Sequence, residues 1–305
     1  MSNYVVNSKM LGLVSATILA TLSLSACQKP AEPKPAEAGA STPSSTATAT
    51  PSAMAGKTIR IATEGTYKPF SITNADGSLS GFDVDYMKAL CSEMQANCDI
   101  KPQDWDGLLP SLLAKKYDVV IDAMSITPER QAQVDFTDPY FTNTLVFITK
   151  KGSPINPDDP AQIDSHAVAA QRSTLSTQWM EKNHPKSKLN LYENLDNAFM
   201  DLASGRSEMM IADKAPAYYW INTPDGKGFE VKGKEIDVDD KMGIIVRKGD
   251  PLKAELNKAI ATTKANGVYD KIYNQYFGTT TTTNASATAT TTQVASSASV
   301  ASVTK

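Results

Sequence analysis

The sequence predicts an α/β fold, and three observations support this prediction. Short apolar runs alternate with longer amphipathic segments between residue 57 and about residue 278. The chain of 305 residues is 41% hydrophobic and 21% charged, which is typical of globular domains. Strands that alternate with helices of this length indicate βαβ units and mostly parallel sheets.

Five apolar runs are predicted as strands and five amphipathic segments as helices. The strands are expected over 58–62, 117–121, 167–170, 209–212 and 242–246. The helices are expected over 83–95, 107–115, 175–182, 194–203 and 251–276. They lie within a region of about 220 residues between the two tails, enough for one large domain or two small lobes.

The first 26 residues are predicted to be an export signal. Lys9 precedes an apolar run that is too short and too rich in Ser and Thr for a membrane span, which needs about 20 apolar residues. The segment from Leu24 to Cys27 resembles the lipobox of bacterial lipoproteins, whose cysteine carries the lipid after cleavage. The alternative is an ordinary signal peptide with an incidental cysteine.

Both flanks of the predicted fold have the composition of disordered chain. Residues 27–56 combine five prolines with Ala, Ser and Thr and contain no aromatic residue, so we expect a tether behind the lipidated cysteine. Residues 279–305 are almost entirely Thr, Ala, Ser and Val, and we expect a disordered tail.

Charge and ligand supply exclude several function classes. The chain has 30 Lys and Arg against 33 Asp and Glu, a formal charge of −3, and no basic run, so nucleic acid is not an expected partner. Only two histidines and three cysteines are present, which excludes a histidine zinc site or a four-cysteine cluster. We therefore predict no metal and no cofactor.

Cys91 and Cys98 form an even pair once Cys27 is set aside. An exported chain meets an oxidising compartment, so a disulfide is expected. Two reduced, buried thiols are the alternative.

Three acidic residues follow three predicted strands, namely Glu64, Asp122 and Asp213. Parallel sheets bind ligands beyond the carboxyl ends of their strands, so the three carboxylates are expected in one cleft that favours a cation. For any single acid, a helix cap or a solvated loop carboxylate is the alternative. Tyr67 and Trp105 lie near acidic residues and could stack on a flat cation, whereas core packing is the default for an isolated aromatic.

Arg130 lies in the first turn of a helix that Thr127 is expected to cap. A guanidinium beside free backbone N–H groups is a receptor for a carboxylate. The alternative is a surface ion pair with an acidic neighbour. Ser173 and Thr174 precede another predicted helix and offer a second set of backbone donors.

With these residues in view, the sequence resembles the family 3 extracellular solute-binding proteins of bacterial ABC importers, which bind polar amino acids. The matching segments span nearly the whole predicted fold in family order: 59–70, 81–85, 105–112, 117–130, 136–138, 201–206, 212–213 and 267–277. The two cysteines with six residues between them are similar to those of the lysine/arginine/ornithine and histidine binders.

The resemblance implies a type II periplasmic-binding-protein fold of two lobes joined by two hinge connections. Lobe 1 is expected over 57–142 and 243–278, and lobe 2 over 143–242. Each lobe is expected to hold a mostly parallel sheet flanked by helices.

The resemblance also assigns roles at the site. Arg130 is expected to bind the α-carboxylate of the ligand, with backbone N–H groups of Ser125 and Thr174. Asp213 is expected to hold the α-ammonium, together with the carbonyl of Ala123 and the hydroxyl of Ser125.

Other expected roles concern the ligand side chain. Glu64 is expected to face it, and Tyr67 and Trp105 to flank it. Two positions depart from the family pattern: Arg172 replaces a common glycine, and Asp122 replaces a common Ser or Ala. If Asp122 faces the cleft, it strengthens the case for a cationic side chain.

The predicted function is that of a substrate-binding lipoprotein in the cell envelope, with no enzymatic activity. It is expected to be a monomer, anchored through Cys27, that captures a basic L-amino acid by hinge closure and delivers it to an ABC permease. Arginine is expected first, then lysine and ornithine. The alternatives are an opine binder (octopine or nopaline), a dehydratase similar to cyclohexadienyl dehydratase, and a surface-exposed interaction lipoprotein.

Overall fold

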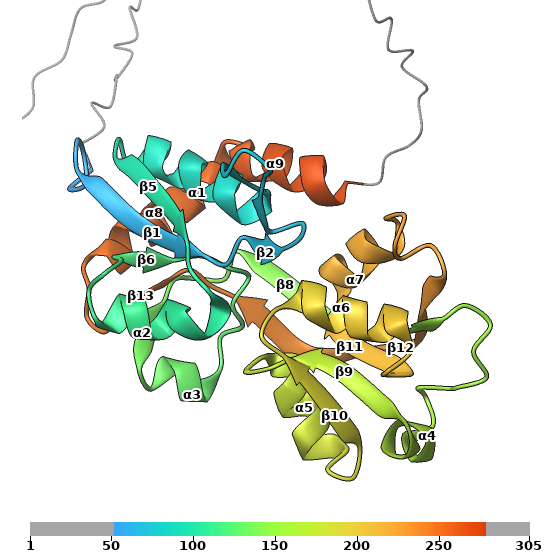
Figure 1. The fold of residues 1–305 in the computed structure, drawn as a ribbon. Helices are drawn as coiled ribbons and strands as arrows, with labels where there is room; N and C mark the ends of the chain where they lie inside the picture. The colour runs from blue at the N-terminus through green and yellow to red at the C-terminus, as the bar shows by residue number, and fades with distance from the viewer. Residues whose placement is uncertain (1–51, 279–305) are drawn as a thin grey trace, which may run out of the picture. The chain divides into compact units, whose positions relative to one another are not determined.

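The computed structural model describes residues 52–278, which form two lobes, each built on a five-stranded sheet (Figure 1). Within these residues, four of the five strands in each sheet run in one direction and one strand runs against them. The predicted α/β class is confirmed. The signal segment, Cys27 and the tail from residue 279 lie outside the described residues.

Lobe 1 has the strand order β5-β1-β6-β13-β7. The strands are β1 (Thr58–Thr63), β5 (Asn97–Pro102), β6 (Val119–Val120), β7 (Val134–Phe136) and β13 (Ile245–Arg247). β1 is parallel to β5 and β6, whereas β13 is antiparallel to β6 and β7. A small sheet precedes the first helix and contains β2 (Thr66–Tyr67), β3 (Ser71–Thr73) and β4 (Leu79–Ser80).

Helices cover both faces of the lobe 1 sheet (Figure 1). They are α1 (Phe82–Glu93), the 3-10 helix η1 (Trp105–Gly107), α2 (Leu108–Leu113), α3 (Pro128–Gln131), α8 (Leu252–Ala265) and α9 (Val268–Phe277). α1 and α8 bury apolar residues on one face, where α9 packs with partly buried side chains, and α2 packs with β6 and β13 on the other face.

Lobe 2 has the strand order β10-β9-β11-β8-β12. Its strands are β8 (Phe141–Lys150), β9 (Ala167–Gln171), β10 (Lys188–Tyr192), β11 (Met209–Asp213) and β12 (Phe229–Met242). Its helices are α4 (Pro160–Ser165), α5 (Leu175–Asn183), α6 (Leu195–Ser204) and α7 (Lys214–Ile221). Alternate residues of β8 point to opposite faces, so Leu145 packs with α4 and α5, and Val146 packs with α6 and α7.

The helix boundaries follow from local chemistry. The side chains of Thr174 and Asn194 accept backbone N–H bonds at the starts of α5 and α6. α6 ends at Gly205, whose φ of 76° is accessible to glycine at no cost. The prediction of one helix over 251–276 is wrong, because the left-handed Gly267, with φ of 77°, separates α8 from α9.

β8 and β12 connect the lobes. Phe141, at the start of β8, packs edge-on against Phe70 and Phe82 of lobe 1. Met242, at the end of β12, pairs with Ser125 of lobe 1. The two strands are hydrogen-bonded to each other along their length, with two register shifts. This antiparallel pair therefore forms the two predicted hinge connections. The strand predicted over 242–246 was misplaced, because Met242 belongs to β12.

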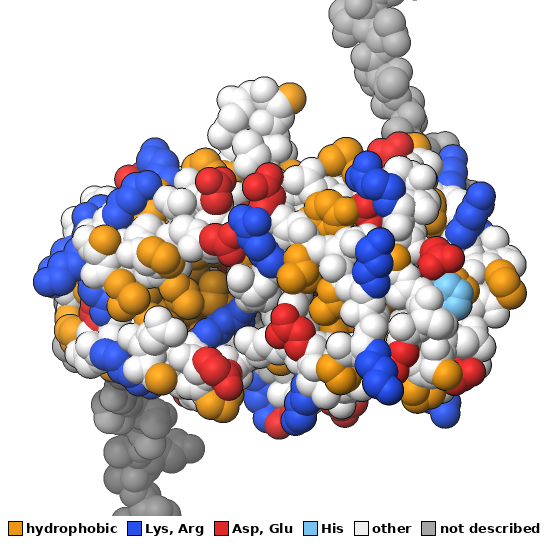
Figure 2. All heavy atoms as spheres, turned by 60° about the horizontal axis from the view of Figure 1, so that its bottom comes forward, with side chains coloured by type: hydrophobic (Ala, Val, Ile, Leu, Met, Phe, Trp, Pro, Cys, Tyr) orange, Lys and Arg blue, Asp and Glu red, His pale blue; other side chains and the backbone are white. Residues whose placement is uncertain are grey.

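Cys91 and Cys98 are joined by a disulfide that links α1 to β5, with 6.0 Å between their Cα atoms. The described chain also begins before residue 57, since Ser52 donates a hydrogen bond to Glu255 of α8 at 2.7 Å. Among residues 52–278, no helix is long and apolar enough to cross a membrane. Acidic and basic side chains are interspersed over the face that Figure 2 shows.

Candidate functional site

Glu64 and Asp122 lie side by side because β1 and β6, the strands before them, are parallel neighbours. The backbone N–H of Glu64 donates to Asp122 Oδ1 at 2.9 Å. Both side chains are buried, with 6% and 1% of their surface exposed. The expectation that strand ends would bring these acids together matches their placement.

Asp122 is held by its own lobe. Its Oδ1 accepts hydrogen bonds from the hydroxyls of Thr63 and Ser71 at 2.8 and 2.9 Å, in addition to the bond from Glu64. Its Oδ2 is buried and has no hydrogen-bond partner among the described residues. Burial raises the pKa of Asp122 to about 6, although these hydrogen bonds oppose the rise. Oδ1 of Asp122 therefore holds neighbouring residues of lobe 1 in place, whereas Oδ2 could accept a hydrogen bond from a ligand.

Glu64 reaches toward lobe 2. Gln171, the last residue of β9, places its amide Nε2 3.3 Å from both carboxylate oxygens of Glu64. Thr66 donates to Glu64 Oε1 at 2.7 Å. Burial, followed by the charge of Asp122, raises the pKa of Glu64 to about 8. A cation that binds beside this buried carboxyl group would stabilise its ionised form and lower its pKa.

Asp213 ends β11 and occupies the N-cap position of α7 without capping it through its side chain. Its carboxylate instead accepts a hydrogen bond from the hydroxyl of Tyr67 in lobe 1. Burial, followed by the charge of Asp240, raises the pKa of Asp213 to about 7. A polar link across the cleft thus joins two residues that the sequence analysis placed at the ligand.

Arg130 is buried, with 7% of its surface exposed, in the first turn of α3. Thr127 caps this turn, as predicted, and accepts the N–H of Arg130 at 3.3 Å. The guanidinium donates to the backbone carbonyl of Ser125 at 2.8 Å and to that of Ser173, in lobe 2, at 2.9 Å. Its hydrogen bonds among the described residues therefore go to carbonyls and not to a carboxylate.

Trp105 and the loop after β9 close the other side of Arg130. The Trp105 ring centroid lies 5.4 Å from Cζ of Arg130, and its indole N–H donates to the carbonyl of Arg172 at 3.1 Å. Arg172 also forms an ion pair with Asp106 at 2.6 Å. Arg172, which departs from the family pattern, thus adds a contact between the lobes.

The two residues predicted as backbone donors in lobe 2 lie in the turn just before α5. Thr174 caps α5 with its side chain, whereas Ser173 is exposed, has a φ of 61°, and turns its carbonyl toward Arg130.

Ala123 and Ser125 lie in the loop between Asp122 and Arg130, and both are buried. Sequence reasoning missed the residue that fixes this loop, Asp83 of α1. Its carboxylate accepts the N–H of Ala123 at 2.6 Å and the hydroxyl of Tyr140 at 2.9 Å. The only sequence signal was its place in the family-like segment 81–85.

Asp240 is a second carboxylate that sequence reasoning missed. It lies near the end of β12, has 3% of its surface exposed, and accepts a hydrogen bond from Asn143 of β8 at 2.9 Å. Burial raises its pKa, and the charge of Arg130 opposes the rise. No strand-end rule selects this residue, because it lies within a strand that joins the lobes.

The described residues contain no cluster of three or more His, Cys, Asp or Glu side chains arranged to hold a metal ion. Besides Asp83, whose carboxylate is bonded to Ala123 and Tyr140, the site contains one buried guanidinium, four buried carboxyl groups and aromatic side chains. This set can bind a zwitterion that carries an additional positive charge.

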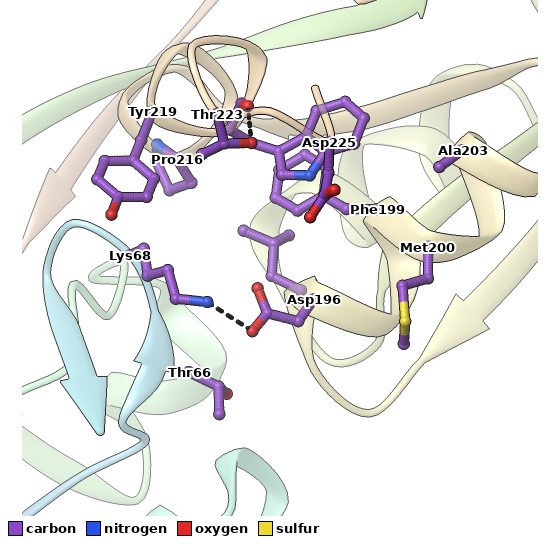
Figure 3. Close-up of a pocket in the computed structure, with 12 residues that line it drawn as sticks. Thr66, Lys68, Asp196, Phe199, Met200, Ala203, Pro216, Tyr219, Thr223 and Asp225 are labelled. Atoms are coloured by element: carbon purple, nitrogen blue, oxygen red, sulfur yellow. Dashed lines mark hydrogen bonds and ion pairs between the residues drawn. The ribbon is translucent and has the colours of Figure 1, made fainter. Parts of the chain in front are cut away.

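A separate cavity of about 480 Å³ lies between β2 and the helices α6 and α7 (Figure 3). Its walls include Phe199 and Trp220, whose rings stack with centroids 4.5 Å apart. Lys68 and Asp196 form an ion pair across it at 2.9 Å. None of the predicted site residues lines this cavity, but its lining residue Thr66 donates the hydrogen bond to Glu64 described above.

Comparison with known proteins identifies the family. Residues 59–279 match the model of the bacterial extracellular solute-binding proteins, family 3. The ABC transporter arginine-binding protein 1 of Escherichia coli (strain K12) is 37% identical over 229 residues, which cover 74% of this chain and 93% of that protein. The chain therefore belongs to family 3 of the bacterial extracellular solute-binding proteins.

Solved structures show the same fold. An ancestral arginine-binding protein bound to arginine superimposes with a TM-score of 0.69 and 36% identity, over 74% of this chain and all of that one. An ancestral amino-acid-binding protein, described as a precursor of cyclohexadienyl dehydratase, gives a TM-score of 0.66 and 35% identity over 72% of this chain and 95% of that one.

Proposed function

We propose that this protein captures a basic L-amino acid, arginine first and then lysine or ornithine, and delivers it to an ABC permease. The observation that carries the proposal is the charge of the cleft. The guanidinium of Arg130 lies within reach of the charges of the buried carboxyl groups Asp213 and Asp240. Glu64 and Asp122 add two more buried carboxyl groups beside each other. A ligand with two positive groups and one negative group balances this set better than a neutral amino acid does.

The α-groups of the ligand bind at the pair formed by Arg130 and Asp213. The α-carboxylate takes the guanidinium, which makes only carbonyl contacts among the described residues, and adds charge-assisted hydrogen bonds. The α-ammonium takes Asp213 in place of the Tyr67 hydroxyl. This part of the site recognises any L-amino acid.

The side chain of the ligand reaches Glu64, with Gln171 beside it. A basic side chain gains a charge-assisted hydrogen bond with Glu64 of about 1.5–3 kcal/mol, which a neutral side chain does not gain. Selectivity for basic ligands thus arises at Glu64, and the free Oδ2 of Asp122 adds to it through charge.

Calorimetry with arginine, lysine, ornithine, histidine, octopine and glutamine tests the proposal. We expect a Kd in the micromolar range or below for arginine, about −8 kcal/mol, and much weaker binding of glutamine. Arg130→Ala should abolish binding of every ligand in the panel. A preference for octopine would support the opine alternative, and a preference for glutamine or glutamate would overturn the proposal.

The protein acts by binding and not by catalysis, in our proposal. The similarity to an ancestral binding protein described as a precursor of cyclohexadienyl dehydratase makes that enzyme the alternative to test. Prephenate and arogenate are anionic, whereas this cleft is rich in carboxyl groups. Product formation after incubation with either substrate would support the enzyme instead.

We further propose that the mature chain is a monomer in the cell envelope, anchored by lipid at Cys27. The periplasmic relatives and the lipobox-like segment support this placement. Labelling of cells with a palmitate analogue should mark the wild-type protein and not Cys27→Ser. Protease treatment of intact cells then separates surface display, as in an interaction lipoprotein, from periplasmic residence.

A further inference from the structure

Asp240 lies where the connecting strand β12 meets the ligand-binding loop of lobe 1. Ser125 pairs with Met242, and the N–H of Ile126 donates to the carbonyl of Lys241 at 2.8 Å. Asp240 is the next residue along this strand. The loop that carries the predicted ligand contacts of Ser125 is therefore bonded directly to the segment that contains Asp240.

The same carboxylate is tied to lobe 2. Asn143 Nδ2 donates to Asp240 Oδ2 at 2.9 Å, and Asn143 Oδ1 accepts the backbone N–H of Lys214 at 3.3 Å. Lys214 follows Asp213, the residue proposed to hold the α-ammonium. Asp240 thus stands between the two proposed α-ammonium contacts, Ser125 and Asp213.

Asp240 Oδ1 is buried and has no hydrogen-bond partner among residues 52–278. A buried carboxylate oxygen without a partner carries a free-energy penalty that a nearby donor would remove. The hydroxyl of Ser125 is close enough to lower the pKa of this carboxyl group, as is the charge of Arg130. Ser125 can therefore supply a hydroxyl hydrogen bond to this carboxyl group.

We propose that Asp240 is a positioning residue for the α-ammonium of the ligand and acts through Ser125. A hydroxyl has one proton to donate and two lone pairs. When Asp240 accepts the Ser125 proton, the Oγ lone pairs point to the cleft and accept from the ammonium group. This inference rests on the proposed function, because it assumes an amino acid with its α-ammonium at Ser125 and Asp213.

The test compares two ligands by calorimetry on the full mature chain: L-arginine, and its α-hydroxy analogue, in which a neutral hydroxyl replaces the α-ammonium. We expect Asp240→Asn to weaken arginine about tenfold and the analogue less than twofold, since a charge-assisted hydrogen bond is lost only with the ammonium. Asp239→Asn is the matched control, because Asp239 is the exposed neighbour on the same strand, with 84% of its side chain exposed.

The Ser125→Ala background shows whether Asp240 acts through the hydroxyl. There, Asp240→Asn should cause no further loss of arginine affinity. Equal losses for the two ligands, or a full tenfold loss in the Ser125→Ala background, would overturn the inference and indicate a purely structural carboxylate. If Asp240→Asn melts below the assay temperature, Ser125→Ala alone must show the same discrimination between the ligands. Failure of the wild-type protein to bind arginine would instead overturn the proposed function.

Discussion

The side-chain amide of Gln171 in lobe 2 lies 3.3 Å from both carboxylate oxygens of Glu64 in lobe 1. This contact joins the two lobes at the acid that we propose for the side chain of the ligand. The amide of Gln171 donates to a buried acid there, and in the proposed binding mode the positive end of the ligand binds beside the same acid.

Glu64→Gln should weaken basic ligands selectively. The variant keeps the shape of the side chain and removes its charge, so we expect about 10- to 100-fold weaker binding of arginine. Binding of glutamine should change less than threefold, because its neutral side chain forms no ion pair with Glu64. Calorimetry with both ligands measures the difference, and Glu181→Gln, at an exposed position on α5, is the control. Equal losses for arginine and glutamine would contradict the assignment of Glu64.

The affinity for arginine should rise with pH between pH 6 and pH 8. Glu64 has a pKa of about 8 in the free protein, and a bound cation lowers that value, so binding releases a proton below pH 8. We expect an increase of about 3- to 10-fold that levels off above pH 8. Titrations in buffers of different ionisation enthalpy count the protons released. A pH profile of Glu64→Gln identical to that of the wild type would refute this origin.

The free protein should become less stable as the pH rises. The folded-state pKa values of Asp122, Asp213 and Glu64 are raised to about 6, 7 and 8, so the folded state holds more protons than the unfolded state above pH 4.5. The stability from these groups is present at low pH and is lost as the pH increases through 8. Melting curves should show a Tm about 2–6 °C lower at pH 8.5 than at pH 5.5. Glu64→Gln should reduce this difference, and addition of arginine should remove most of it.

The ion pair between Arg172 and Asp106 should strengthen ligand binding by holding the lobes together. A double-mutant cycle with Arg172→Gly and Asp106→Asn should give a coupling of about 0.3–1 kcal/mol in the free energy of binding, or about 2- to 5-fold in Kd. The coupling should shrink in high salt. The pair Arg60 and Asp118 lies within lobe 1 and serves as the control, since its cycle should leave Kd unchanged. No coupling at low salt would mean that the Arg172 pair does not stabilise the closed arrangement.

The central strands of each sheet could be located from the sequence, but the edge strands β5, β7 and β10 and the connecting strands β8 and β12 could not. β1, β9 and β11 are short apolar runs and were predicted within one residue at each end. β12 alternates Glu, Lys and Asp with few apolar residues, because it is an edge strand whose order comes from hydrogen bonds to β8. Hydrophobic periodicity reveals strands with a buried face, whereas most residues of β12 are not buried.

The candidate site divides in the same way. Glu64, Asp122 and Asp213 could be located because strand ends converge in a parallel sheet. Asp83 and Asp240 could not, because one lies in a helix and the other within a connecting strand. Their proximity to the site depends on tertiary packing that no local pattern encodes.

The position of β13 also constrains the order in which the molecule can assemble. β13 lies between β6 and β7, yet all of lobe 2 separates it from β7 along the chain. A growing chain has every strand of the second lobe once residue 242 has been made, while the sheet of the first lobe still has a gap in it. Lobe 2 can therefore fold before lobe 1 is complete. The sheet of lobe 1 keeps an open strand edge until β13 has been synthesised.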